Sequence, residues 1–129
     1  METGIKGSMQ IKVTSEMTAE EVGSGQLSVL ATPVMISLME ETAWKSVAPY
    51  LEEGQGTVGT LMNVRHLSAT PVGMNIQIET ELTEIDRRRL VFSVKASDEA
   101  GPVGEGVHER FIIDNEKFFS KATAKLAKA

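Results

Sequence analysis

The sequence predicts an α+β fold in which a curled antiparallel sheet wraps around one central helix, with a further helix at the C-terminal end. Two observations carry this prediction. One long apolar segment begins at a threonine–proline pair at residues 32–33, and four later segments alternate between apolar and polar residues and are separated by turn sequences. Sequential strands joined by short turns form an antiparallel sheet, and a helix that is apolar on most sides must pack on its face.

The central helix is predicted from Thr32 to Ala48. Thr32 is expected to be the N-cap and Pro33 to take the first helical position, where its missing N–H costs nothing. Pro49 ends or kinks the helix, because proline disrupts the hydrogen-bond ladder. The first half of the segment is apolar nearly all round, which is typical of a helix that is buried on most sides.

The strands are predicted from residues that alternate with a period of two. A short strand over 10–13 is followed by a loop over 15–28; turn sequences at 71–73, 86–88 and 98–101 separate the later strands, and the tail over 115–128 is expected to be helical. Residues 1–9 are expected to be a disordered extension or an expression remnant, and residues 10–129 a single domain. This order of elements is that of the hot-dog fold. The alternating residues are Val58, Met62, Val64; Met74, Ile76, Ile78, Leu82; Leu90, Phe92, Val94, Ala96; and Val107, Phe111, Ile113.

The composition removes several classes of protein. The chain has 129 residues, a net charge of −5 and no cysteine. The lack of cysteine excludes a disulfide framework, a thiolate zinc site and a cysteine nucleophile. Its two histidines have no metal-binding spacing, so no metal is predicted. The acidic balance argues against nucleic acid as a partner, and no apolar run is long enough to span a membrane. A cytoplasmic protein is expected.

Glu40 is a candidate catalytic residue because of its place on the predicted helix. The other residues of its helical stripe are all apolar: Ile36, Ala43, Trp44 and Val47. A carboxylate among apolar side chains is costly unless it is paired, hydrogen-bonded or protonated, and such carboxylates are enriched at catalytic sites. The alternative is a structural pairing. Glu41 lies on a different stripe, where Lys45 offers an ordinary i,i+4 ion pair.

His66 and Thr32 are the other two candidates. By strand alternation His66 shares a face with Val58, and it points toward the helix if that face covers the helix; the alternative is a core histidine with both ring nitrogens satisfied. An imidazole beside a carboxylate is a common acid–base pair. Capping alone explains Thr32, although a helix N-terminus also suits a developing oxyanion. Eight residues span about 12 Å of straight helix, so Thr32 and Glu40 share a site only if the lead-in bends or a second subunit contributes.

Two further polar groups remain open. His108-Glu109-Arg110 follows Val107 on the last strand, so one member is expected to face inward, and a structural ion pair is the simplest interpretation. The basic residues 87–89 are expected to be a solvated hairpin tip, with phosphate binding as the alternative.

Taken together, these residues resemble the fluoroacetyl-CoA thioesterase family over about residues 28–120. The resemblance lies in the order of several short motifs rather than in any one of them. The motifs are Ala31-Thr32-Pro33, Leu38-Met39-Glu40, Ala48-Pro49-Tyr50-Leu51-Glu52, Gly54, Gly56, Gly59-Thr60, Val64, His66, Ala69-Thr70-Pro71, Arg88-Arg89-Leu90, Gly104-Glu105-Gly106, His108-Glu109-Arg110 and Glu116-Lys117-Phe118.

The resemblance implies a hot-dog fold and a homodimer, or a dimer of dimers, with sites at the subunit interface. It implies metal-free hydrolysis of acyl-CoA thioesters to free acid and thiol, with no cofactor beyond the coenzyme A of the substrate. Thr32, Glu40 and His66 fall on the family's catalytic positions. Gly59 matches a glycine that lines the site and Arg110 an arginine close to it. Our hypothesis is that Glu40 attacks the carbonyl or activates water, and that His66 transfers protons or orients the attack. Thr32 then positions the substrate or water, or is itself the nucleophile.

The resemblance also has a departure. The fluoroacetate-resistance enzyme of the family has phenylalanines in the segment before its threonine, whereas residues 23–28 here contain no aromatic residue. We therefore expect general acyl-CoA hydrolysis without specialisation for fluoroacetyl-CoA. A hot-dog enoyl-CoA hydratase would need an aspartate and a histidine near the helix start, and residues 23–41 contain neither. A non-catalytic acyl-CoA-binding protein is the other alternative, and it would need no carboxylate on the apolar stripe.

Overall fold

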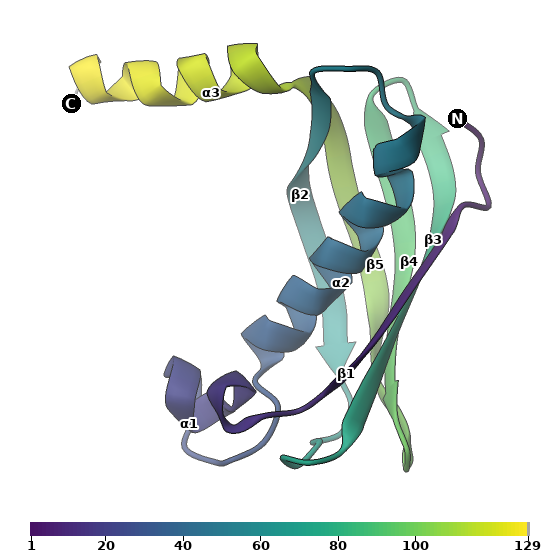
Figure 1. Ribbon diagram of the computed structural model, residues 1–129, viewed down its shortest axis with the longest axis vertical. Coiled ribbons are helices and arrows are strands. Elements are labelled where there is room, and N and C mark those ends of the chain that lie inside the picture. Colours follow the sequence, from purple (N-terminus) through teal and green to yellow (C-terminus); the bar gives the residue numbers. More distant parts are fainter. Residues whose placement is uncertain (129) are drawn as a thin grey trace.

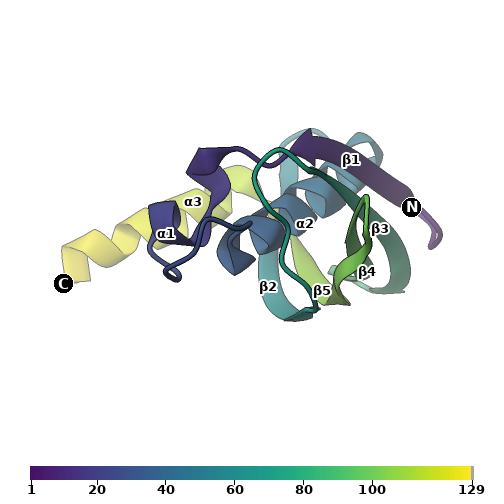
Figure 2. The same ribbon diagram turned by 90° about the horizontal axis from the view of Figure 1, so that it is seen from below.

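The computed structural model describes residues 1–128 and shows a five-stranded antiparallel sheet curled around one long helix (Figure 1). The helix α2 (Thr32–Val47) crosses the concave face of the sheet, as the second view also shows (Figure 2). The sheet order is β1-β3-β4-β5-β2. The strands are β1 (Lys6–Lys12), β2 (Gln55–His66), β3 (Asn75–Asp86), β4 (Arg89–Asp98) and β5 (Gly101–Asp114). The predicted arrangement is confirmed.

The shorter helices lie at the two ends of the sheet. The 3-10 turn η1 (Ser15–Met17) and helix α1 (Ala19–Val22) lie within the segment predicted as a loop over 15–28. The 3-10 turn η2 (Ala48–Tyr50) follows α2, where Pro49 was expected to end it. The predicted helical tail is α3 (Asn115–Thr123) with the 3-10 turn η3 (Ala124–Lys128). No described helix is long and apolar enough to cross a membrane.

The N-terminal residues contradict one prediction. Residues 6–9, expected to belong to a disordered extension, form the first half of β1 and pair with β3 from Lys6↔Glu81 onward. The pairing extends back to the Gly4 N–H, which donates to the Leu82 carbonyl at 2.8 Å. The error arose because this part of the strand, Lys6-Gly7-Ser8, has no large apolar residue and so gives no alternating signal. Backbone pairing rather than side-chain burial holds it.

The core lies between α2 and the concave face of the sheet. From α2, six residues are buried: Met35, Leu38, Met39, Thr42, Ala43 and Val47. The sheet contributes alternate residues of its central strands, as the period-two pattern predicted. These are Ile76, Ile78, Leu82, Leu90, Phe92, Val94, Ala96 and Val103.

Gly7 lets β1 pass very close to α2. A Cβ at this position would lie 2.8 Å from the Thr80 hydroxyl oxygen, 2.9 Å from Ser46 Cβ and 2.9 Å from the Thr42 carbonyl oxygen. The Thr80 hydroxyl is buried and has no hydrogen-bond partner among the described residues. Because one of the three atoms is backbone, a side chain here cannot be accommodated by rotamer changes alone.

Gly7→Ala is therefore expected to destabilise the protein by about 1–3 kcal/mol, the usual cost of overpacking. Chemical denaturation followed by circular dichroism measures this. Ser8→Ala is the matched control, because Ser8 is the next residue of the same strand and is exposed. Equal stability of Gly7→Ala and the wild type would contradict this account of the contact.

Two β-bulges lie in one row across the sheet. The register shifts at Thr60 in β2 and at Thr83 in β3. Each extra residue donates its hydroxyl to the strand beside it: Thr60 to the Glu109 carbonyl at 3.3 Å and Thr83 to the Val91 carbonyl at 3.2 Å. Val91 and Glu109 are themselves paired across β4 and β5. Bulges bend a strand and increase its twist, so this row helps the sheet curl around α2.

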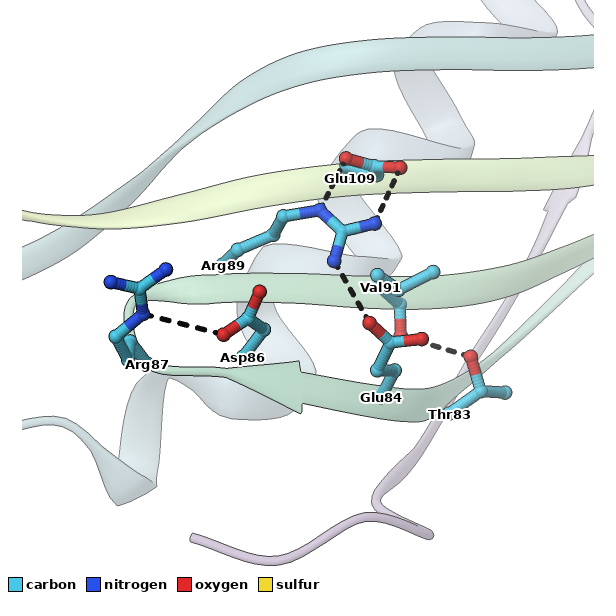
Figure 3. A network of polar contacts seen from close by, with 7 residues as sticks. All are labelled: Thr83, Glu84, Asp86, Arg87, Arg89, Val91 and Glu109. Atoms are coloured by element: carbon cyan, nitrogen blue, oxygen red, sulfur yellow. Dashed lines mark hydrogen bonds and ion pairs between the residues drawn. The ribbon is translucent and has the colours of Figure 1, made fainter.

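On the face of the sheet away from α2, Arg89 joins three strands beside this row (Figure 3). It donates to both carboxylate oxygens of Glu109, at 2.8 and 3.2 Å, and to Glu84 at 2.8 Å. These bonds lower the pKa of Glu109 and raise that of Arg89. The solvated hairpin tip predicted over residues 87–89 is thus wrong for Arg89. It holds for Arg87, whose side chain is 90% exposed and contacts Asp86 at 3.4 Å.

Candidate active site

Thr32 and His66 form a hydrogen-bonded pair at the N-terminal end of α2. The Thr32 hydroxyl oxygen lies 2.8 Å from His66 Nδ1. The predicted cap is wrong by one residue: Ala31 is the N-cap, with φ −71° and ψ 140°, and Thr32 is the first helical residue. No side chain caps this helix. The threonine hydroxyl is therefore not used by the backbone, and capping does not explain it.

His66 ends β2 on the face toward α2, as predicted. Its imidazole is half-buried, and Nε2 is buried without a hydrogen-bond partner among the described residues. Burial lowers the pKa of His66, and the nearby backbone of Ser68 has a smaller opposing effect. A neutral imidazole beside a hydroxyl can accept its proton, which is the arrangement of an activated nucleophile.

The prediction that Val58 lies on the same face of β2 as His66 is wrong. Gly59 is opposite Arg110 and faces Glu40 on α2, whereas Val58 is opposite Phe111, which is 43% exposed. The bulge at Thr60 explains the error, because one extra residue reverses the face on which later side chains lie. His66 faces inward because it follows the bulge.

The lowered pKa of His66 predicts how hydrolysis depends on pH. If the neutral imidazole accepts the Thr32 proton, kcat/KM is expected to fall as pH drops through the His66 pKa, with an acid limb below 6.5. Burial, joined by the charge of Arg110, also lowers the pKa of His108, so stability too decreases below pH 6.5, where the unfolded chain binds more protons. Circular dichroism at each pH separates the two effects. An acid limb above pH 6.5 in a folded enzyme would contradict the assignment.

Glu40 lies at the margin of the core rather than inside it. Its side chain is 43% exposed, and Trp44 on the same stripe is 42% exposed. The predicted apolar stripe is thus only partly buried, because the core-facing side of α2 is centred on Met35 and Met39. The expected ion pair of Glu41 and Lys45 is present at 2.9 Å, and both side chains are exposed, as its solvated role requires.

Arg110 is the counter-charge of Glu40. Its guanidinium is buried, and Nη1 lies 3.6 Å from Glu40 Oε2. Nε donates to the Thr57 hydroxyl at 2.8 Å and Nη2 to the Thr57 carbonyl at 2.9 Å. Burial lowers the pKa of Arg110, and the Glu40 carboxylate opposes that shift. These bonds fix the guanidinium so that one edge is directed at the carboxylate.

His108 completes this second group. Its Nδ1 lies 2.8 Å from the Leu61 carbonyl oxygen, and a carbonyl only accepts, so Nδ1 carries the proton. Nε2 must then accept, and Arg110 Nη1 donates to it at 3.2 Å. The sequence left open which member of His108-Glu109-Arg110 faces inward. Both His108 and Arg110 do, and Glu109 lies on the opposite face.

Gly59 lies against the same group. A Cβ there would be 2.7 Å from Glu40 Oε2, 3.3 Å from His108 Cε1 and 3.4 Å from Arg110 Nη1. A glycine at this position leaves room for the carboxylate beside the strand. Sequence reasoning missed Thr57 and His108 as parts of this group. The alternation of residues on β5 could have predicted that His108 faces inward. The face on which Thr57 lies could not be predicted, because the bulge at Thr60 shifts the alternation on β2.

One chain thus carries two half-sites along α2: a hydroxyl–imidazole pair at Thr32 and His66, and a carboxylate–guanidinium group at Glu40 and Arg110. The eight residues from Thr32 to Glu40 span about 12 Å of helix. The structure brings two of the three predicted catalytic residues together and places the third beyond direct contact. Among the described residues, no group of three His, Asp or Glu side chains is arranged to hold a metal ion.

Solved structures with this sheet and helix arrangement include thioesterases. A thioesterase superfamily member from Thermus thermophilus is 28% identical, with a TM-score of 0.88 over 99% of this chain and 97% of that one. A fluoroacetyl-CoA thioesterase variant in complex with acetyl-CoA is 34% identical, with a TM-score of 0.92 over 97% and 98% of the two chains. The fold and these relatives accordingly place the chain among thioester hydrolases of the hot-dog fold.

The sequence comparisons identify the family within this class. Residues 13–116 match the model of a family described as fluoroacetyl-CoA-specific thioesterase. A fluoroacetyl-CoA thioesterase from Streptantibioticus cattleyicolor is 42% identical over 97 residues, which are 75% of this chain and 70% of that protein. The chain belongs to the fluoroacetyl-CoA thioesterase family.

Proposed function

We propose that the protein hydrolyses an acyl-CoA thioester to a carboxylic acid and free coenzyme A. The observation that carries this proposal is the 2.8 Å bond between the Thr32 hydroxyl and a His66 imidazole of lowered pKa, at a helix end where no cap uses the hydroxyl. Relatives solved with acetyl-CoA, and with fluoroacetate and coenzyme A, support a substrate of this kind.

In the proposed mechanism, Thr32 Oγ1 attacks the thioester carbonyl while His66 accepts its proton. The C–S bond then breaks, the proton passes from His66 to the departing thiolate, and the acyl group remains as an ester of Thr32. The Glu40 carboxylate, held by Arg110, removes a proton from the water that attacks this ester. The bond between the acyl carbon and Thr32 Oγ1 then breaks, the carboxylic acid leaves, and the proton passes from Glu40 to Thr32 Oγ1, which restores both groups. Pro33 has no N–H and the Val34 N–H bonds to the Ala31 carbonyl, so we assign the oxyanion to the Thr32 N–H rather than to several helix amides.

Mass spectrometry of enzyme quenched during turnover tests these roles. An acyl group on the peptide that contains Thr32 is expected. An acyl group on Glu40 would instead make the carboxylate the nucleophile and contradict the assignment. Binding of acyl-CoA with thermal stabilisation but no thiol release would indicate a non-catalytic binding protein and refute the proposed function.

We further propose a homodimer that joins the half-sites. The strand β2 lies at the edge of the sheet and carries Gly59 near one half-site and His66 in the other. Antiparallel pairing of β2 with β2 of a second copy, with Gly59 opposite His66, would place Glu40 of each copy beside Thr32 of the other. Two equivalent sites result, because a two-fold interface is self-complementary.

Complementation between inactive variants tests this dimer. Thr32→Ala chains mixed with Glu40→Gln chains form heterodimers in which one of the two sites is intact. Random exchange makes half of the dimers mixed, so about one quarter of the wild-type activity is expected. If each site lies within one chain, mixing restores nothing.

For the acyl group, we propose no specialisation for fluoroacetyl-CoA. Residues 23–28 are exposed and contain no aromatic side chain, although the family model and the curated relative are named for that substrate. Without dedicated contacts, one small substituent changes kcat/KM by less than about 200-fold. Thiol release from acetyl-, fluoroacetyl-, long-chain and aromatic acyl-CoA measures this, and a larger fluoroacetyl preference would contradict it. We propose the cytoplasm as the location, on the ground of the cysteine-free sequence.

A further inference from the structure

Residues 115–128, which form α3 and η3, extend away from the sheet beyond the edge strand β2 (Figures 1 and 2). We refer to them as the C-terminal arm. Every residue of the arm is exposed, including three large apolar side chains: Phe118 at 45%, Phe119 at 70% and Leu126 at 80%. Solvent-exposed aromatic and aliphatic residues gathered on one protruding element indicate a contact with another molecule.

The arm is also basic, unlike the rest of the chain. It contains four lysines and one glutamate, a net charge of +3, so the remaining residues carry −8 of the total of −5. Lys117, Lys121 and Lys125 recur every four residues, which places Lys117 and Lys121 on one side of α3. The surface that it fits is therefore acidic with exposed apolar side chains.

This chain has such a surface in the lead-in segment, residues 14–31, which contains η1 and α1. The segment holds Glu16, Glu20 and Glu21, all exposed, and no lysine or arginine. Its charge of −3 matches the +3 of the arm. Val22 at 45% and Leu27 at 69% exposure supply apolar contacts.

Within one molecule the arm and the lead-in segment lie on the same side of β2 but at opposite ends of it (Figures 1 and 2). The arm starts beside the first residues of β2, where the Asn115 N–H donates to the Gly54 carbonyl at 2.9 Å. The lead-in segment leads into Thr32, which contacts His66 at the last residue of β2. Antiparallel pairing of two β2 strands brings the first residues of one strand beside the last residues of the other.

We infer that the C-terminal arm docks on the lead-in segment of a second copy of this chain. This inference rests on the β2 pairing proposed above. In the dimer each arm crosses the shared edge and places its lysines by Glu16, Glu20 and Glu21 of the other copy. The arm thereby covers the segment that precedes Thr32 in the second copy, and so affects how that Thr32 is positioned.

Cross-linking tests the contact directly, because the chain has no cysteine of its own. Phe119→Cys chains mixed with Leu27→Cys chains are expected to give a covalent dimer with a short bismaleimide. Phe119→Cys mixed with Lys95→Cys is the control, since Lys95 is exposed on β4 away from the lead-in segment. The inference would be overturned if sedimentation shows a dimer but neither mixture gives a cross-link. It would also be overturned if both mixtures give the cross-link equally.

Charge reversal gives a second, independent measurement. Changing Lys117, Lys121 and Lys125 to Glu is expected to weaken the dimer about tenfold at low salt, since each exposed ion pair contributes a few-fold. Adding Glu16→Lys, Glu20→Lys and Glu21→Lys should restore the affinity, because the signs are then exchanged. Lys6, Lys12 and Lys95, each changed to Glu, form the matched control on the exposed sheet surface. No loss, or loss without restoration, would overturn the inference.

A basic arm with aromatic residues could instead fit an anionic membrane surface. Membrane binding would replace the inference if the wild type co-sediments with phosphatidylcholine–phosphatidylglycerol vesicles, if Phe119→Ser abolishes this binding, and if no cross-link forms. A wild type that is monomeric at all concentrations would also refute it. Acyl-CoA hydrolysis measured on the same samples shows separately whether the proposed function stands.

Discussion

Replacing Glu40 by glutamine is expected to lower kcat for acyl-CoA hydrolysis by about 10²–10⁴-fold, the usual contribution of a general base. The amide cannot accept a proton from water, although its oxygen can still lie beside the Arg110 guanidinium as the carboxylate does. The side chain is 43% exposed, so the fold should tolerate the change. Thiol release under saturating acyl-CoA measures kcat, and circular dichroism confirms that the variant is folded.

Glu41→Gln is the matched control for this experiment. Glu41 is the next residue of α2 and pairs with Lys45 on the helix surface. An exposed i,i+4 pair contributes only about 0.3–0.5 kcal/mol to stability, and the Glu41 carboxylate pairs with Lys45, whereas Arg110 pairs with Glu40. Its loss should leave kcat within about twofold. Equal activity of the two variants would remove Glu40 from the mechanism.

Thr32→Ala is expected to lower kcat by about 10³-fold or more, because the nucleophile is lost and the acyl-threonine ester cannot form. Thr32→Ser should retain substantial activity, since it keeps a hydroxyl within reach of His66 Nδ1. The alanine variant should also release no burst of thiol in single-turnover experiments. These three measurements together identify the hydroxyl, rather than the volume of the side chain, as the active feature.

Helix stability provides a check on the role of Thr32. Because Ala31 is the N-cap and no side chain caps α2, Thr32→Ala removes no capping bond. The loss of a cap would cost about 0.5–2 kcal/mol, whereas an exposed first-turn residue should cost less than about 0.5 kcal/mol. A large loss of stability together with retained activity would show that Thr32 is a structural residue.

The buried arginine has a cost that the surrounding groups must offset. Arg110 is 6% exposed, and a buried guanidinium is unfavourable unless its donors are satisfied. Thr57, His108 and Glu40 supply those partners. A neutral His108 is necessary for this arrangement, because an imidazolium could not accept a hydrogen bond from Arg110.

Several features could be predicted from local patterns. The period of 3.6 residues located α2, and the period of two located β3 and β4, because burial on one face constrains every residue of the repeat. Glu40 stood out as a carboxylate among apolar neighbours, and the Glu41–Lys45 pair followed from helical spacing alone. The strand pairing of Lys6–Met9 could not be predicted, since it depends on backbone bonds to β3 rather than on side-chain pattern.

The sequence by itself determined the order of the elements, the helix–sheet core and the residue types available for catalysis, because burial and turn chemistry are local properties of the chain. Only the tertiary structure decided which side chains meet. The N-cap of α2 is Ala31, one residue before the predicted Thr32, so the Thr32 hydroxyl is free to bond to His66. One extra residue at Thr60 turned Gly59 toward Glu40 and kept His66 inward. Both outcomes depend on register and distance between segments far apart in the sequence, which no local pattern specifies.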